Sequence, residues 1–377
     1  MRLILALGLA TGVLVSLPLW LSVRGFPLMP RMPVVPPPPP PLDSAAVAVL
    51  LLLALAIMVR PQPRVEILGL SLVTALLVLA DQNRCQPWVY QYVAMLVVAG
   101  PSVRGEPPGG TATRLDALRV MLASIYVWSG IQKINLLFFN DIALWLVEPI
   151  ADHLPSSVRP LVEASGYAFP AAEIFVGVGL LVSRLQRPAL VLGLAMHLFI
   201  LYAIGPLGHD VNRTVWPWNA VMMSLLWILF GAPARLDVRS LWSSRPVLLR
   251  RLAIIAFAVL PAFNFVGLWD AYLSWGLYNN LALEADVYIA PRALPCLPDD
   301  VRRHVTRAND RNVLHVWDWA MDVLGAPPYP ERWVYRRIRD QLCVCDPGGD
   351  LILFELWDPS RWRLPITPED HRCGEAW

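Results

Sequence analysis

Long apolar stretches separated by short polar segments fill the chain up to about residue 270. An α-helix needs roughly 20 residues to cross the hydrocarbon core of a bilayer, and these stretches reach or approach that length. The pattern therefore predicts an all-α polytopic membrane helix bundle with about nine transmembrane helices. The stretches lie at 3–22, 44–60, 65–81, 87–103, 115–138, 167–184, 187–206, 215–231 and 250–269.

Beyond residue 270 the apolar runs become short and interrupted, which is typical of a small soluble α+β lobe. We expect a strand-rich start that includes Trp275, Tyr278 and 286–289. One or two amphipathic helices over 301–324 and a buried strand at 351–356 are expected to follow. The predicted organisation is a first helix with a Pro-rich outer linker (1–43), the helix bundle (44–270) and the extracytoplasmic lobe (271–377).

Two features of the N-terminal region, the first apolar stretch and the proline run, each have an alternative interpretation. Arg2 and the apolar stretch after it resemble a secretory signal, but no small-residue cleavage site follows, so an uncleaved first helix is expected. The proline run at 36–41 is expected to form an extended polyproline II spacer, with a ligand for a partner domain as the alternative.

Composition supports a membrane protein surrounded by lipid. Hydrophobic residues make up 56% of the chain and charged residues only 16%, against about 25% charged residues in soluble domains. The mean hydropathy is +0.50. A net charge of +2 and the absence of any Lys/Arg tract argue against a nucleic-acid partner.

Arginine placement predicts the orientation, because cytoplasmic loops carry an excess of Lys and Arg. Most arginines between the stretches follow the second, fourth, sixth and eighth of them. These are Arg60, Arg64, Arg104, Arg114, Arg184, Arg187, Arg235, Arg239, Arg245, Arg250 and Arg251. The prediction is an integral protein of the inner cell membrane with a cytoplasmic N-terminus and an extracytoplasmic lobe.

Lys133 is the only lysine, since every other one of the 31 Lys and Arg residues is an arginine. A desolvated lysine can lose its proton and act as a base or nucleophile, whereas arginine keeps its charge. An ionisable residue at membrane depth is therefore a candidate functional residue. The alternative is that Lys133 lies near a helix end and extends to the lipid head groups.

Glu173 and His197 are two further titratable side chains within apolar stretches. An isolated charge at this depth is costly, so we expect a Lys133–Glu173 pair, or one that also includes His197. We assign all three as candidate catalytic residues. The alternative for His197 is a simple hydrogen bond to a neighbouring helix.

Polar and aromatic side chains at the outer helix ends, together with Tyr126 on the same helix face as Lys133, are candidates for binding a ligand head group. Tryptophan and tyrosine there have an alternative role as interface anchors. The predicted head-group residues are Asp81, Gln82, Asn83, Arg84, Gln86, Trp88, Tyr126, Trp218 and Asn219. His209 and Asp210 are adjacent but lack a third spaced ligand, so no metal site is predicted.

Four of the five cysteines belong to the lobe: Cys296, Cys343, Cys345 and Cys373. In an oxidising compartment they are expected to form up to two structural disulfides, with three pairings open, while Cys343 and Cys345 as a redox pair is the alternative. Cys85 is left as a buried thiol or a partner of a lobe cysteine.

The run from Tyr126 to Asn135, Y-x-x-S-G-x-Q-K-x-N, and the later helix with His197 resemble a known family. This is the vitamin K-dependent gamma-carboxylase-like (HTTM) membrane family, with DoxX-like character, and the resemblance covers about 70–235. It implies a quinone or reduced naphthoquinone as cofactor and Lys133 as the base that reacts with the hydroquinone.

Two function classes follow. The first is a quinol-dependent carboxylase-like enzyme or oxidoreductase, in which Lys133 is the base and Glu173 and His197 orient it. The second is a non-enzymatic membrane scaffold or assembly factor whose lobe binds a secreted or periplasmic protein. A transporter would need internal repeats or discontinuous helices, and no convincing pair of halves is found.

Overall fold

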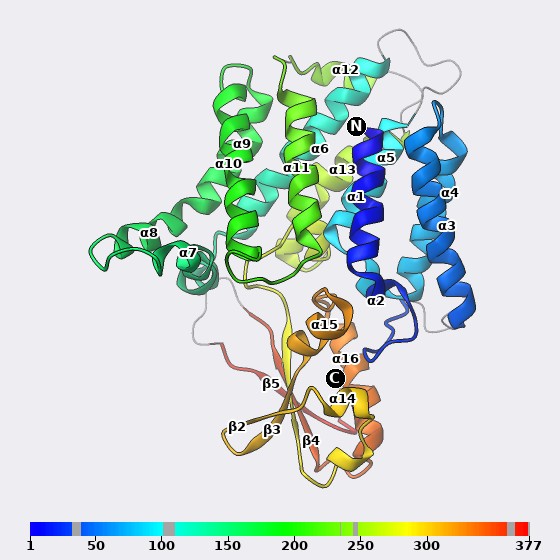
Figure 1. Ribbon diagram of the computed structural model, residues 1–377, viewed down its shortest axis with the longest axis vertical. Helices are drawn as coiled ribbons and strands as arrows, with labels where there is room; N and C mark the ends of the chain where they lie inside the picture. The colour runs from blue at the N-terminus through cyan, green and yellow to red at the C-terminus, as the bar shows by residue number, and fades with distance from the viewer. Residues whose placement is uncertain (32–38, 101–109, 234, 244–247, 360–365, 376–377) are drawn as a thin grey trace. The chain divides into compact units, whose positions relative to one another are not determined.

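The computed structural model is mostly helical and has a small antiparallel sheet near its C-terminus (Figure 1). It describes residues 1–31, 39–100, 110–233, 235–243, 248–359 and 366–375. Residues 36–38 of the predicted proline spacer therefore lie outside the described residues, whereas Pro40 and Pro41 belong to the first turn of a helix and not to an extended segment. The chain forms two compact units. The first contains Met1–Leu14, Ala48–Ala75 and Gln86–Asn280, and the second contains Val15–Val47, Leu76–Cys85 and Leu281–Trp377.

Helices make up the first unit. They are α1 (Arg2–Val15), α5 (Pro87–Ala99), α6 (Gly110–Gln132), α7 (Ala143–Ala151), α8 (Arg159–Ser165), α9 (Phe169–Leu181), α10 (Gln186–Ile204), α11 (Val215–Phe230), α12 (Val238–Ser243) and α13 (Leu248–Ala258). Helices α3 (Pro40–Val59) and α4 (Arg64–Ala80) contribute residues to both units.

Within the described residues, four helical segments are long and apolar enough to cross a membrane. They are Pro40–Val59, Arg159–Leu181, Gln186–Ile204 and Leu248–Val266. The second of these joins α8 and α9 through a short 3-10 turn, η3 (Gly166–Ala168). The expectation of an integral membrane protein is confirmed, whereas a count of nine spans stays a prediction.

Glycines allow α6 and α9 to pack closely. A Cβ atom at Gly130 would lie 2.6 Å from the Pro170 carbonyl oxygen, and one at Gly177 would lie 2.7 Å from the Ala123 carbonyl oxygen. Small residues at helix interfaces permit such backbone approach in membranes, where packing rather than water exclusion holds helices together. The close approach brings the polar side chains of the two helices within bonding distance.

The second unit contains a five-stranded antiparallel sheet with the strand order β2-β3-β1-β4-β5. The strands are β1 (Glu284–Ile289), β2 (Thr306–Ala308), β3 (Arg311–His315), β4 (Ile352–Trp357) and β5 (Glu369–Arg372). The unit also contains α2 (Leu17–Trp20), α14 (Asp299–Arg302), α15 (Val316–Leu324) and α16 (Arg332–Leu342).

Alternating burial along the two central strands forms the core of this sheet. Val287 of β1 pairs with Phe354 of β4, and both are fully buried, as are most apolar residues two positions away. Side chains in a strand alternate between faces, so the apolar set shares one face. Helix α15 packs against β1 and β3, and α16 packs against β4. The predicted strand at 351–356 is confirmed.

Two expectations for the lobe are wrong in part. One or two helices are expected over 301–324, and α15 and the end of α14 are helices there, but the β2–β3 hairpin lies between them. Asn309 and Asp310 both have positive φ, which a two-residue hairpin turn requires and Asn and Asp tolerate. Trp275 and Tyr278 lie before the first strand, also with positive φ, instead of in an extended segment.

Two disulfides link the lobe, Cys296–Cys345 and Cys343–Cys373, and Cys85 belongs to neither of them. The expectation of structural bridges among the four lobe cysteines is confirmed. Both bridges close loops around the sheet, which restricts the unfolded chain.

Candidate functional site

The first unit contains a cavity of about 410 Å³ with a mainly apolar wall. Helices α6, α9, α10 and α11 supply most of this wall and lie side by side (Figure 1), and the segment 275–278 completes it. Sites for small molecules are typically of this size, apolar, and fitted with a few convergent polar groups. The cavity brings together six of the predicted site residues: Tyr126, Lys133, Glu173, His197, Trp218 and Asn219.

Lys133 reaches the cavity because α6 ends immediately before it. The Asn135 side chain accepts a hydrogen bond from the Phe138 amide at 2.8 Å and donates one to the Gln132 carbonyl at 3.1 Å. A side-chain oxygen that accepts from a backbone amide three residues later marks the start of a new helix, so α6 does not continue through Asn135. The break leaves Lys133 at the helix end, facing α9.

The predicted Lys133–Glu173 pair is confirmed. Lys133 Nζ donates to Glu173 Oε2 at 3.1 Å and to Ser129 Oγ at 2.7 Å. The two charged side chains are only 7% and 9% exposed, so the pair is shielded from water. An ammonium and a carboxylate that are buried together compensate each other, whereas either one alone would be strongly unfavourable.

His197 does not join this pair and instead forms its own hydrogen-bond chain. Its Nδ1 lies 2.7 Å from Asn219 Oδ1, and its Nε2 lies 2.6 Å from the Tyr126 hydroxyl. Asn219 Nδ2 donates to the Val215 carbonyl at 2.8 Å, which fixes Oδ1 as the acceptor from His197. A neutral imidazole protonated at Nδ1, with the Tyr126 hydroxyl donating to Nε2, satisfies every bond in the chain.

Two cavity contacts involve residues that the sequence did not assign to the site. Trp218 Nε1 donates to Gln91 Oε1 at 2.7 Å, and Asn212 Nδ2 donates to the Tyr278 hydroxyl at 3.2 Å. Burial raises the pKa of the Tyr278 phenol, against the opposing effect of the Asn212 bond. Tyr278 therefore stays protonated at neutral pH. Only the density of aromatic residues near 275–278 marks this segment in the sequence.

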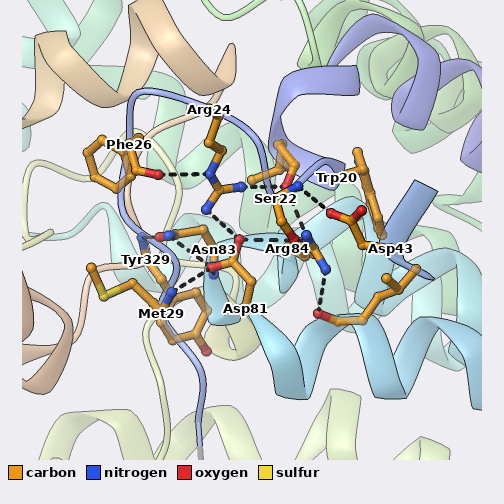
Figure 2. A network of polar contacts seen from close by, with 12 residues as sticks. Trp20, Ser22, Arg24, Phe26, Met29, Asp43, Asp81, Asn83, Arg84 and Tyr329 are labelled. Carbon is orange, nitrogen blue, oxygen red and sulfur yellow. Dashed lines mark hydrogen bonds and ion pairs between the residues drawn. The ribbon is translucent and has the colours of Figure 1, made fainter. Parts of the chain in front are cut away.

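Asp81 is the centre of a separate polar network in the second unit (Figure 2). Its Oδ2 accepts from Arg24 at 2.5 Å, and its Oδ1 accepts from the Met29 amide and from Asn83 Nδ2, each at 3.1 Å. Asn83 Oδ1 in turn accepts from the Tyr329 amide at 2.9 Å. The network joins three segments that are far apart in the sequence.

Arg84 adds a second buried guanidinium to this network. Its Nε lies 3.7 Å from Asp81 Oδ2 and donates to the Leu19 carbonyl at 3.1 Å. Burial lowers the pKa of Arg84, and Asp81 opposes that effect. Because Asp81, Asn83 and Arg84 have these protein partners, their predicted role as head-group ligands stays a prediction without further support.

Three other predicted head-group residues are buried outside the cavity wall. They are Gln82, Gln86 and Trp88. Gln82 donates its backbone amide to the Met29 carbonyl at 2.7 Å, and Gln86 precedes the first turn of α5. A Cβ atom at Gly12 would lie 2.6 Å from the Trp88 ring, so this indole packs directly against α1.

In a comparison with protein families, residues 111–212 match the model of methylamine utilisation protein MauE. This range runs from α6 to just beyond α10 and includes Tyr126, Lys133, Glu173 and His197. The expected relationship to the vitamin K-dependent gamma-carboxylase-like (HTTM) family and to DoxX-like proteins is wrong, because the matching family is a different one. Comparison with curated proteins and with solved structures finds no match.

Proposed function

We propose that this chain is a non-enzymatic accessory protein of the membrane that binds a lipid-soluble molecule in the cavity of its helical unit. One observation carries the proposal. The cavity is mainly apolar, and its titratable groups already bond to one another or to neighbouring protein groups. Such a wall offers fixed polar contacts to a bound head group. The match to a methylamine utilisation protein favours an accessory role over carboxylation.

The pairing of Lys133 disfavours a role as a base. A general base must be free to take a proton from the substrate. The Lys133 ammonium is balanced by Glu173, and both nitrogens of His197 are occupied by hydrogen bonds. Quinol oxidation with Lys133 as the base would have to break the ion pair first.

A quinol head group suits the chemistry of the pair. A lysine ammonium has three N–H donors, and two of those of Lys133 make the short bonds to Ser129 and Glu173. Lys133 Nζ also lies 3.5 Å from the Ser129 carbonyl oxygen, which is too far for a strong bond, so the third N–H can turn to a ligand oxygen. A phenolic hydroxyl can accept from Lys133 and donate to Glu173, whereas a quinone carbonyl can only accept.

Binding of a reduced naphthoquinone to the full chain in lipid nanodiscs tests this proposal. We expect the reduced form to bind more tightly than the oxidised form. We also expect the double variant Lys133→Met/Glu173→Leu to lose about tenfold or more in affinity, because a hydrogen bond to a charged group contributes about 1.5 kcal/mol or more. Arg159→Met, which removes an exposed cation outside the cavity wall, serves as the control.

Equal affinity of the wild type and the double variant for the reduced form would contradict the proposal. Oxygen uptake measured in the same samples separates binding from turnover. We expect no uptake that depends on Lys133. A Lys133-dependent uptake would favour a quinol-oxidising enzyme.

The lobe is a second candidate binding region besides the cavity, and we infer that it binds a secreted or periplasmic protein. Its two disulfides fit an oxidising compartment outside the cytoplasm. The arginine-rich loops fit the cytoplasmic side of the membrane. The matched family range ends at residue 212, so the lobe is an addition to the part of the chain that the family model describes.

A further inference from the structure

We infer that the cavity opens sideways into the lipid, between the segment that leads into α9 and helix α10. We further infer that its occupant has a long apolar tail that leaves through this opening. The inference rests on the proposed function and names the class of ligand. Its basis is the set of cavity-lining residues that are also exposed on the protein surface.

Three small residues line the cavity and are also exposed on the protein surface. Within the described part of the chain, the lining residues that are exposed are Ser165, Ala168 and Ala195. Residues of the wall contributed by α6, α11 and the segment 275–278 are buried or half-buried. An opening needs lining atoms that are also accessible from outside, so the mouth lies at these three residues.

This mouth belongs to two helical segments that can span a membrane. Ser165 and Ala168 lie in the segment Arg159–Leu181, and Ala195 lies in Gln186–Ile204. Only 39% and 33% of the residues in the apolar windows of these segments are buried inside the protein, so the unburied apolar side chains of α9 and α10 can face lipid, whereas the charged start of α8, with Arg159 and Glu163, faces water. A molecule that enters between them comes from the bilayer and not from water.

The shape and chemistry of the mouth fit a long apolar tail. Small side chains at Ala168 and Ala195 leave space between the two helices, and the half-buried rings of Phe169 and Phe199 line the wall beside it, with their centroids 5.2 Å apart. The polar groups lie on the buried side, on Lys133 and Glu173. A head group bound at that pair would leave its tail to pass between the helices into the lipid.

Blocking the mouth with a large side chain tests this inference. Two probes are compared on the full chain in nanodiscs: a reduced naphthoquinone with an isoprenoid tail and the same head group without a tail. We expect Ala195→Trp to weaken binding of the tailed probe about tenfold or more, a loss of about 1.4 kcal/mol. The tail-less probe should change by less than about threefold, because it does not need the mouth once bound.

Val191→Trp is the matched control. Val191 lies one turn before Ala195 on the same helix, is 66% exposed, and does not line the cavity. It should leave the binding of both probes unchanged. An equal loss of both probes in Ala195→Trp, or equal losses in the two variants, would overturn the lateral opening while leaving the cavity as a binding site. Failure of the wild type to bind either probe would instead refute the proposed function.

Discussion

Glu173→Leu is expected to destabilise the helical unit by about 3 kcal/mol or more, because it leaves the Lys133 ammonium buried without its partner. The double variant Lys133→Met/Glu173→Leu is expected to recover most of that loss, since apolar residues of similar size often replace a buried pair at no cost. Unfolding of the full chain in a detergent or denaturant titration measures both effects.

The same substitution at an exposed glutamate is the control for this result. Glu163 pairs with Arg159 on the protein surface, where an ion pair contributes little. Glu163→Leu should therefore leave the unfolding transition almost unchanged. If the double variant is as unstable as the sum of its two single variants, Lys133 and Glu173 are not coupled and the ion pair does not hold α6 to α9.

Asp81→Ala is expected to have the second large effect, on the second unit. The carboxylate balances Arg24, whose side chain is 1% exposed, and Arg84, whose side chain is fully buried. Removing it leaves Arg24 without its carboxylate partner and leaves Arg84 with the smaller effect of Asp43 alone, which predicts a loss of about 3 kcal/mol or more. The segment 22–31 should also become sensitive to proteases, since Asp81 holds Met29 directly.

Limited proteolysis followed by mass mapping, together with thermal unfolding, measures this loss. Glu66→Ala is the control, because the partner Arg60 is 66% exposed and can be hydrated when the pair is broken. An Asp81→Ala protein with wild-type stability and a protected 22–31 segment would show that backbone contacts, not the network of Figure 2, hold this unit together.

How much of the site the sequence predicts depends on whether a physical requirement limits the possible partners of a residue. The Lys133–Glu173 pair could be predicted because a single physical demand, compensation of buried charge, limits the partners of a lone lysine. The chain from Tyr126 through His197 to Asn219 could not. Its members are neutral polar side chains with many possible partners, so their contact depends on how three helices are rotated about their axes.

The residues around Asp81 also show that the sequence does not identify partners from distant parts of the chain. Its polar residues at a helix boundary suggested contact with a ligand, but their partners Arg24 and Tyr329 come from distant parts of the chain. No local pattern in the sequence connects these segments. In the lobe, by contrast, the missed β2–β3 hairpin had a local signal in Asn309-Asp310, which was outweighed by the helical spacing of the apolar residues around it.

The resemblance on which the carboxylase expectation depended was short. The motif from Tyr126 to Asn135 combines a helix-packing glycine with a buried lysine and a capping asparagine. Each of these residues has a structural reason to be there that does not depend on a reaction. A motif of this kind therefore predicts local geometry better than it predicts chemistry.

The most direct test of the central claim is mass spectrometry of the lipids that copurify with the full chain, compared between the wild type and Lys133→Met/Glu173→Leu. The account predicts that a quinone with an isoprenoid tail accompanies the wild type and is lost or strongly reduced in the double variant. The same amount of quinone in both proteins, or none in either, would contradict it.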